Sequence, residues 1–149
     1  MDRRAFPLFA QPLAVWERDG LKAALAKVGL PGDDVAEPSR LFWRFERDDV
    51  PVGFGGLEVF GEDALLHSLV TLPPVRQRGI GRSIVAQLET EARGRGARSV
   101  YLLTTDMADF FAELGYAACE RKAVPPAIAA TPHYTSLCMA SATAMVKRI

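Results

Sequence analysis

The feature that most constrains this chain is a short, basic, glycine-containing loop between a predicted strand and a predicted helix. The loop reads Arg-Gln-Arg-Gly-Ile-Gly and spans residues 76–81. An apolar run at residues 65–72 and a Pro-Pro pair precede it, and apolar residues at helical spacing follow it, at Ile80, Ile84 and Leu88. This pattern predicts a strand, a tight loop and the first turn of an amphipathic helix.

Such a loop has the properties of an anion site. The first N–H groups of a helix have no partner within the helix and carry partial positive charge, so they attract phosphate groups. Gly79 and Gly81 let a ligand approach the backbone, and Arg76, Arg78 and Arg82 add positive charge. The loop is therefore predicted to bind a diphosphate. It lacks the Gly-Lys-Ser/Thr of a P-loop and the first glycine of a dinucleotide fingerprint. Taken alone, an ordinary glycine turn with exposed arginines is the alternative.

The Thr-x-Pro-x-x-Arg-x-x-Gly-x-Gly pattern that begins at Thr71 resembles the acetyl-CoA motif of the GNAT acetyltransferase superfamily. A second segment, Phe-Phe-Ala-Glu-Leu-Gly-Tyr at residues 110–116, is similar to a helix end that follows this motif in the same family. The two matches cover roughly residues 64–117. The resemblance implies a single GNAT domain over residues 1–149, of the α/β (α+β) class. Its mixed central sheet is expected to have splayed parallel strands and flanking helices.

The same resemblance implies that acetyl-CoA is the cosubstrate. In the family, backbone N–H groups on the strand before the loop polarise the thioester carbonyl, and the loop binds the diphosphate. The residues that the resemblance places against acetyl-CoA are Leu69, Val70, Thr71, Arg76, Gln77, Arg78, Gly79, Ile80, Gly81, Arg82 and Phe111.

Phe111 stands where the family often has a tyrosine that acts as general acid. A phenyl ring cannot return a proton to the leaving thiolate. Either another group supplies that proton, or the thiolate leaves unprotonated, which its modest pKa permits. We therefore interpret Phe111 first as a packing residue, against the pantetheine arm of acetyl-CoA or against the core.

Two residues are candidates for the general base that takes the amine proton. His67 lies four residues before Thr71, so strict alternation places it on the same face of its strand as Leu69 and Thr71. An imidazole titrates near neutrality, and some arylalkylamine acetyltransferases resemble this chain in placing a histidine there. Glu58 lies on the neighbouring predicted strand, where partial burial would make its carboxylate a better base. For both residues an ordinary structural or surface role is the alternative.

The acceptor pocket is expected to involve the C-terminal part of the chain. Tyr134, Ser136 and Ser141 can hydrogen-bond a small polar substrate, and Arg44 can pair with a carboxylate. Packing at the rim is the alternative role for Tyr134, and a surface charge is the alternative for Arg44.

The whole chain is also similar to a narrower branch, the small acetyltransferase-like proteins linked to arsenic-resistance operons. The segments that carry this similarity are residues 29–31, 33–35, 53–58, 102–105 and 136–142. It implies a detoxifying N-acetyltransferase whose acceptor is a small amine such as an amino-acid-like arsenical. Binding a free arsenic ion would require clustered thiolates, because soft centres prefer sulfur, and the chain has only Cys119 and Cys138.

Charge and composition restrict the other functions. The 18 basic and 18 acidic residues cancel, so neither nucleic acid nor an anionic membrane is an expected partner. No apolar run reaches the ~18 residues of a membrane span, and residues 1–4 do not begin a signal peptide, so a cytoplasmic location is expected. With two cysteines and two histidines, no metal site is expected. The expected partner is a small-molecule amine, with a homodimer left open. A non-catalytic acyl-CoA-binding or regulatory protein is the alternative function, and Phe111 favours it.

The remaining segments complete the predicted sheet. Residues 1–12 are expected to be irregular, and a helix is expected to begin near Asp19. Asp48 and Asp49 form a predicted hairpin turn, and Gly53, Gly55 and Gly56 indicate a bend or a close backbone approach. The strand before the loop and the strand after the helix should be parallel neighbours. The expected strands are residues 13–16, 41–47, 52–60, 65–72, 99–104, 117–120 and 142–148, and the expected helical segments after the loop are residues 80–92, 107–114 and 125–130.

Overall fold

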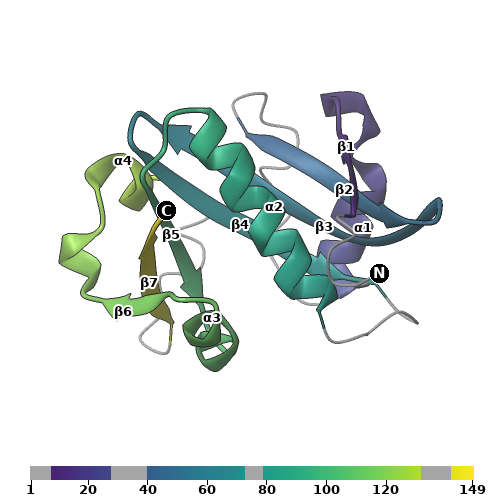
Figure 1. The fold of residues 1–149 in the computed structure, drawn as a ribbon. Coiled ribbons are helices and arrows are strands. Elements are labelled where there is room, and N and C mark those ends of the chain that lie inside the picture. The colour runs from purple at the N-terminus through teal and green to yellow at the C-terminus, as the bar shows by residue number, and fades with distance from the viewer. Residues whose placement is uncertain (1–7, 28–39, 73–78, 132–141) are drawn as a thin grey trace.

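A seven-stranded mixed sheet forms the centre of the molecule in the computed structural model, which describes residues 8–27, 40–72, 79–131 and 142–149 (Figure 1). The strands are β1 (Phe9–Pro12), β2 (Leu41–Arg47), β3 (Val50–Phe60), β4 (Asp63–Thr71), β5 (Ser99–Thr104), β6 (Ala117–Cys119) and β7 (Thr143–Arg148). The helices are α1 (Asp19–Lys27), α2 (Ile80–Gly94), α3 (Ala108–Glu113) and α4 (Pro126–Ala129), with 3₁₀ turns at Val15–Glu17 and Arg121–Ala123. These elements confirm the predicted strands, apart from the first one, and the predicted helices.

The order of the strands in the sheet is β1-β2-β3-β4-β5-β7-β6. Of the neighbouring pairs, β4 and β5 run parallel, and α2 connects them. The other pairs are antiparallel. The predicted parallel crossover is therefore confirmed, and so is the mixed α+β architecture that the family resemblance implies.

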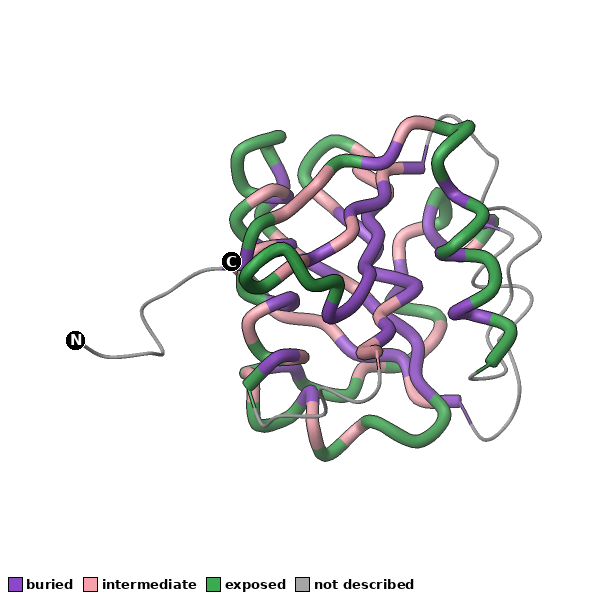
Figure 2. The backbone as a smooth tube through the Cα atoms, turned by 90° about the vertical axis from the view of Figure 1, so that its right-hand side faces the viewer, coloured by how far each residue is buried: buried purple, intermediate pink, exposed green. Residues whose placement is uncertain are grey.

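Helices cover both faces of the sheet. Helix α2 crosses one face and buries Ile84 and Leu88 in the main core, whereas α1 packs on the opposite face through Leu21 and Leu25 (Figure 1). Ile128 of α4 packs in a third cluster beside β5 and β7. Buried residues concentrate on the central strands, and exposed residues lie on the outer turns of the helices (Figure 2).

The glycines of β3 let neighbouring groups approach the strand closely, as predicted. A Cβ on Gly53 would lie 2.5 Å from the carbonyl oxygen of Val70, and one on Gly55 would lie 2.7 Å from a methyl carbon of Leu88. A Cβ on Gly56 would lie 2.5 Å from Cε1 of His67. Gly55 therefore admits α2 on one face, and Gly56 admits an imidazole on the other.

The prediction for the first strand was wrong. The strand is Phe9–Pro12, within the segment expected to be irregular, and residues 13–16 leave the sheet. Two forces fix this placement. Leu8 is buried in the main core, and the carboxamide of Gln87 on α2 binds its backbone, accepting from its N–H at 2.9 Å and donating to its C=O at 2.8 Å. Because β1 is an edge strand, Pro12 is tolerated at its end.

A buried polar cluster joins α2 to the C-terminal strands. The Tyr116 hydroxyl donates to the Glu89 carboxylate at 2.9 Å, and Lys147 Nζ donates to both of its oxygens at 3.0 Å. Burial, and then the neighbouring Glu89 charge, raise the pKa of Tyr116. The cluster satisfies a carboxylate that is only 8% exposed, and it connects three separate elements.

Replacing Glu89 by alanine is expected to lower the free energy of unfolding by about 3 kcal/mol, because it removes the partner of a buried hydroxyl and the counter-charge of Lys147. Glu91→Ala is the matched control. Glu91 lies on the same helix, and its largely exposed carboxylate oxygen is 3.6 Å from a guanidinium nitrogen of Arg95. The loss of this contact should lower the free energy of unfolding by less than about 0.5 kcal/mol. Urea unfolding measures both values, and similar costs for the two variants would contradict the stabilising role of the cluster.

Further observations concern membrane-spanning helices, metal ligands and the cysteines. Within the residues described above, no helix is both long and apolar enough to cross a membrane, and no group of three His, Cys, Asp or Glu side chains could hold a metal ion. Cys119 is partly buried on β6, and burial raises the pKa of its thiol, as is usual for a cysteine that packs as a small apolar residue. Cys138 lies outside the described residues.

Candidate functional site

The central strands part beside the start of α2. Strands β4 and β5 pair at Asp63–Ser99, Ala64–Val100 and Leu65–Tyr101, and their pairing ends there. Beyond Leu65, β4 remains paired with β3, while β5 stays paired with β7 and turns away (Figure 1). The predicted splay is therefore confirmed, and it leaves one side of β4 without a neighbouring strand over residues 66–71.

A β-bulge interrupts β4 at this point. Phe54 pairs with Val70 and Gly56 pairs with His67, so the single residue Gly55 lies opposite two residues of β4. One of these is Ser68, whose φ of +59° lies in the left-handed region that non-glycine residues rarely adopt. The extra residue reverses the alternation of side chains along the rest of the strand.

The bulge corrects the predicted placement of His67. Leu69 packs in the main core on the α2 face, whereas Val70 packs with α1 on the opposite face. His67 contacts Phe42, which belongs to the α1 cluster. His67 therefore shares a face with Val70, and not with Leu69 and Thr71 as strict alternation predicted.

The backbone N–H groups of β4 divide between its two sides. The N–H of Leu72 donates to the carbonyl of Val52 on β3 at 2.9 Å. The alternation of an antiparallel ladder then directs the N–H of Val70 toward β3 as well, and the N–H of Thr71, which lies between them, toward the open side. Of the three residues expected to polarise a carbonyl, Thr71 thus presents its N–H to the gap and Val70 does not. Leu69 lies in the bulge, where the regular alternation is interrupted, so its role stays a prediction.

The start of α2 has the geometry expected of an anion site. Gly79 is the N-cap residue, with a φ of +102°, and a Cβ placed on it would meet no atom of the described residues within 4 Å. Ile80 is buried in the core, so only its backbone can contact a ligand. The Arg82 side chain is exposed, and a nitrogen of its guanidinium group lies 3.8 Å from a carboxylate oxygen of Glu113 on α3. Arg76, Gln77 and Arg78 lie outside the described residues.

The second glycine of the motif has a different role from the first. A Cβ on Gly81 would lie 3.2 Å from Cζ of Phe110, so Gly81 lets α3 pack against the first turn of α2. The interpretation of Phe111 as a packing residue is confirmed. Its ring is buried in the main core, 5.6 Å from the Tyr116 ring and 5.0 Å from the Phe110 ring. A contact between Phe111 and a ligand stays a prediction.

Close packing and one polar contact hold the His67 side chain in place. Its Nδ1 lies 3.0 Å from the Ser68 hydroxyl, and its ring meets Phe42 edge-on at 5.2 Å. The absence of a Cβ on Gly56 makes room for its Cε1–Nδ1 edge. The side chain is 2% exposed, so packing fixes the orientation of the ring.

Glu58 lies on the same face of the sheet and forms an ion pair with Arg40. Their closest N and O atoms are 3.3 Å apart, and the Arg40 side chain is 1% exposed. A second buried arginine, Arg18, stacks over the Phe42 ring at 4.8 Å and donates to the carbonyl oxygens of Leu13 and Arg40. Burial lowers the pKa of Arg18. The α1 face beside the splay therefore carries a polar cluster. Its members are the buried residues Arg18, Arg40, His67 and Ser68 and the partly buried Glu58, of which only Glu58 and His67 were predicted.

Because Arg40 is buried, removing the charge of Glu58 is expected to destabilise the fold. We expect Glu58→Gln to lower the free energy of unfolding by about 1–3 kcal/mol, because a buried guanidinium loses its counter-charge. Glu46→Gln is the control, since it removes a weaker contact with Arg44 at 3.9 Å and should cost at most about 1 kcal/mol. Chemical unfolding measures both. A Glu58 variant as stable as the Glu46 variant would show that the ion pair contributes little.

The predicted acceptor residues are only partly located. Arg44 lies opposite Phe54 on β2 and pairs with Glu46, which fits its alternative role as a surface charge. Tyr134, Ser136 and Ser141 lie outside the described residues. A substrate contact for each of these four stays a prediction.

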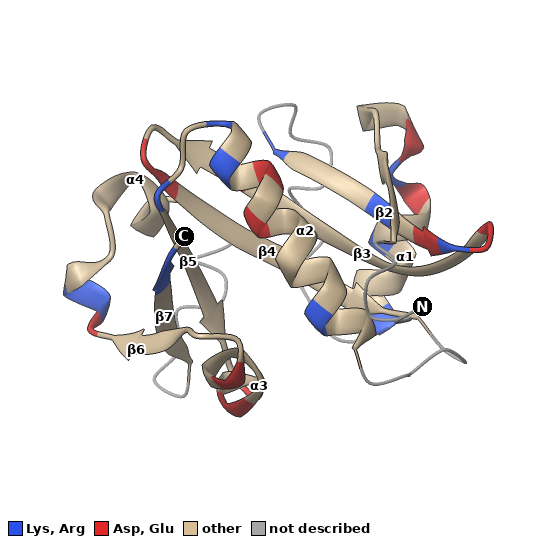
Figure 3. Cartoon of the chain, in the orientation of Figure 1, with Lys and Arg blue, Asp and Glu red and all other residues tan. Residues whose placement is uncertain are grey.

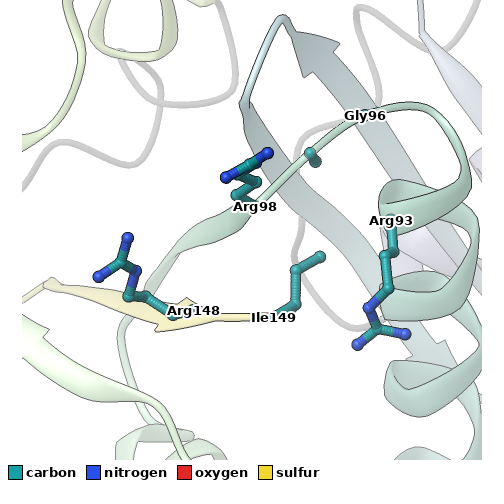
Figure 4. Close-up of a pocket in the computed structure, with 6 residues that line it drawn as sticks. Arg93, Gly96, Arg98, Arg148 and Ile149 are labelled. Atoms are coloured by element: carbon teal, nitrogen blue, oxygen red, sulfur yellow. The ribbon is translucent and has the colours of Figure 1, made fainter.

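A separate hollow of about 500 Å³ lies at the other end of α2, lined by Arg93, Gly96, Ala97, Arg98, Arg148 and Ile149. It does not form a second anion site. The C-terminal end of a helix carries partial negative charge, which disfavours anions and is complemented by arginines. The three guanidinium groups lie apart from one another and do not converge on one point (Figure 4). Along the helices and strands seen in Figure 3, basic and acidic residues both occur.

Comparison with known proteins shows the family of this chain. A family model described as the acetyltransferase (GNAT) family matches residues 6–116. N-alpha-acetyltransferase 80 from Mus musculus is 44% identical over 52 residues, which cover 35% of this chain and 17% of that protein. The uncharacterized protein YyaT from Bacillus subtilis is 36% identical over 70 residues, which cover 46% of this chain and 47% of that protein. The chain thus spans less than half of the length of either relative.

A solved structure extends the likeness over nearly the whole chain. N-acetylglutamate synthase from Neisseria gonorrhoeae, complexed with coenzyme A and N-acetyl-glutamate, matches with a TM-score of 0.75. The identity is 20%, and the match covers 94% of this chain and 35% of that one. At this identity the likeness shows the fold.

Proposed function

Because the chain belongs to the acetyltransferase (GNAT) family, we propose that it transfers the acetyl group of acetyl-CoA to the amine of a small molecule. The observation that carries this proposal is the parting of β4 from β5 beside the start of α2. A gap lined by backbone N–H groups and adjoining a helix N-terminus suits an acyl thioester joined to a diphosphate. The coenzyme A in the Neisseria structure supports the choice of cosubstrate.

Strand β4 and helix α2 would bind different parts of acetyl-CoA. The diphosphate would lie at the N-terminus of α2, where Gly79 leaves the backbone uncovered. The pantetheine arm would extend along the open side of β4, and the N–H of Leu69 or Thr71 would donate to the thioester carbonyl oxygen. This donor would stabilise the negative charge that develops when the amine attacks.

The chemical step is a direct transfer. The amine nitrogen forms a bond with the carbonyl carbon, the carbon–sulfur bond breaks, and coenzyme A leaves as a thiolate. The amine gives up one proton, which we assign to His67 as general base. The thiolate leaves unprotonated or takes a proton from solvent, since the buried Phe111 ring cannot supply one.

His67 is preferred to Glu58 for a structural reason. Glu58 serves as counter-charge to the buried Arg40 and cannot accept a proton without weakening that pair. The His67 ring is itself buried, so the amine proton would reach it through the gap beside β4, directly or through one water.

The proposal also concerns the identity of the amine that accepts the acetyl group. The Neisseria protein was solved with N-acetyl-glutamate, which is a small acetylated amine, and this supports a small-molecule acceptor for this chain. The sequence similarity to the arsenic-resistance branch supports an amino-acid-like arsenical as acceptor and a cytoplasmic location. Pairing with a second copy of the chain stays a prediction.

A panel of small amines incubated with acetyl-CoA tests this function. Free thiol should appear only with a productive amine, and mass spectrometry should show a product that is heavier by one acetyl group. The panel should include amino acids, aminoglycosides, arylalkylamines and amino-acid-like arsenicals. If acetyl-CoA binds but every amine fails to release thiol, the second candidate function applies. That candidate is a non-catalytic acyl-CoA-binding or regulatory protein. It is favoured because position 111 is a phenylalanine and not a tyrosine.

A further inference from the structure

The sheet consists of two parts that share little backbone pairing. The first part contains β1, β2, β3 and β4, and the second contains β5, β7 and β6 (Figure 1). The ladder between the parts ends after the pair Leu65–Tyr101, so among the described strands the backbone joins them at one end of β4 only. The angle between the parts, and with it the width of the gap beside residues 66–71, therefore depends on side-chain contacts.

Helix α2 extends from the open end of this gap to its closed end. A Cβ on Gly81 would lie 3.9 Å from a methyl carbon of Thr71, so the first turn of α2 lies at the open end. Glu89 lies about two helical turns further on, about 12 Å along the axis. Its partner Lys147 pairs with Val100 of β5, and Val100 pairs with β4. Glu89 therefore lies at the closed end, where the two parts of the sheet meet.

Three hydrogen bonds connect Glu89 to the second part of the sheet. The Tyr116 hydroxyl, next to β6, and Lys147 Nζ, on β7, donate to its carboxylate. Gly115 makes room for this lysine, because a Cβ there would lie 3.3 Å from the lysine Cε. Helix α2 itself packs closely on β3 of the first part. Apolar contacts are non-directional, whereas hydrogen bonds require a particular distance and angle, so these bonds orient the second part on α2.

A row of aromatic rings leads from Glu89 back to the start of α2. The Phe111 ring lies 5.6 Å from the Tyr116 ring and 5.0 Å from the Phe110 ring, and both pairs meet edge-on. Cζ of Phe110 would be only 3.2 Å from a Cβ on Gly81 in the first turn of α2. Because protein interiors are close-packed, a shift of Tyr116 would displace α3 at the helix start where the diphosphate is expected.

We propose that Glu89 is a positioning residue for acetyl-CoA. Through Tyr116 and Lys147 it holds the two parts of the sheet at the angle at which the gap beside β4 and the start of α2 bind the thioester and the diphosphate together. Glu89 acts through these partners and not by contact with the ligand. This inference rests on the proposed function, because it assumes that acetyl-CoA occupies the gap.

Two substitutions and one control isolate this role. Glu89→Ala removes the carboxylate, and Tyr116→Phe removes one hydroxyl while it keeps the ring in the aromatic row. Gln87→Ala is the matched control, because it removes two hydrogen bonds between the same helix and Leu8, which lies beside β1 in the first part of the sheet. All three variants lose hydrogen bonds of α2, but only the first two lose bonds that cross between the parts.

The first measurement needs no ligand. Residual dipolar couplings of the backbone N–H groups report how the two parts of the sheet are oriented relative to each other. We expect one fixed orientation in the wild type and in Gln87→Ala, and a different or averaged orientation in Glu89→Ala and Tyr116→Phe. If Glu89→Ala does not fold, Tyr116→Phe alone decides. The proposal is overturned if the folded variants of the cluster keep the wild-type orientation, or if Gln87→Ala changes it as much as they do.

The second measurement is calorimetric titration with acetyl-CoA, at a temperature where the variants compared are folded. If the binding-competent orientation has a population of about one in ten, the apparent affinity falls by about 10-fold. We expect a loss of this order in Glu89→Ala, a smaller loss in Tyr116→Phe and none in Gln87→Ala. Saturating acetyl-CoA should restore the wild-type orientation in both cluster variants, because binding selects the competent state.

Wild-type affinity for acetyl-CoA in both Glu89→Ala and Tyr116→Phe would overturn the proposal, and so would an equal loss in Gln87→Ala. If the wild type itself does not bind acetyl-CoA, the proposed function fails, whereas the dipolar couplings still decide whether Glu89 fixes the angle between the two parts of the sheet.

Discussion

Replacing Gly79 by glutamate is expected to weaken binding of acetyl-CoA by about 10²–10³-fold while the protein remains folded. Like charges about 4 Å apart near a protein surface repel by about 4 kcal/mol, and about 1.4 kcal/mol corresponds to a factor of ten in affinity. The new carboxylate would lie at the N-cap of α2, where no described residue approaches a Cβ within 4 Å and where the diphosphate is expected. Calorimetric titration measures the affinity.

Two controls isolate the effect of the charge. Gly79→Ala introduces the strain of a side chain at positive φ without a charge, so it should weaken binding far less than Gly79→Glu. Gly96→Ala has the same strain at the other end of α2, where φ is +97° and a Cβ also meets nothing within 4 Å, and it should leave the affinity unchanged. If the Gly79→Glu and Gly96→Ala variants bound acetyl-CoA with equal affinity, the diphosphate would not bind at this helix start.

Replacing His67 by glutamine is expected to lower kcat/KM by about 10²–10⁴-fold, the usual effect of losing a positioned base. Glutamine retains a hydrogen-bonding amide but does not titrate near neutrality. The acidic limb of the pH–rate profile should therefore lose its imidazole-like step, and acetyl-CoA affinity should stay the same. Thiol release measured between about pH 5 and 9 reports both effects.

Glu58→Gln provides the comparison for His67. It should reduce stability, for the reason given above, and should reduce kcat/KM much less than His67→Gln does. The opposite order would assign the proton to Glu58. Two small effects would mean that the amine arrives deprotonated and that positioning of the reactants dominates the rate.

The strand, loop and helix around the motif could be predicted because local patterns determine them. Apolar spacing marked α2, and the glycines of β3 marked close approaches on both faces of the sheet. The parallel pairing of β4 with β5 followed from the helix between them. A family resemblance then placed the splay, which no side chain in the sequence encodes by itself.

The bulges could not be predicted, and they decide the details of the site. One extra residue in β4 moves His67 away from the face of Leu69 and Thr71. A second irregularity lies in β3. Simple counting from the Asp48–Asp49 turn would place Glu58 opposite Ser39, but the register shifts by one residue, and Glu58 meets Arg40. Such shifts depend on packing between distant elements, which periodicity does not report.

The first strand was missed for a similar reason. Phe9–Pro12 has no clear alternation and ends in proline, so its local sequence does not favour a strand. The contact between Gln87 and Leu8, which are 79 residues apart, holds this segment against the sheet. A single sequence does not show a contact over that distance.

The most direct test of the account is to map the backbone amides that respond when acetyl-CoA is added to the nitrogen-labelled protein. The account predicts large shifts for the N–H groups of Leu69 and Thr71, smaller shifts for Val70, and further large shifts through the first turn of α2 from Gly79. The hollow beside Arg93 and Arg148 should not respond. Shifts concentrated at that hollow, with Leu69, Thr71 and Gly79 unchanged, would contradict the placement of the site.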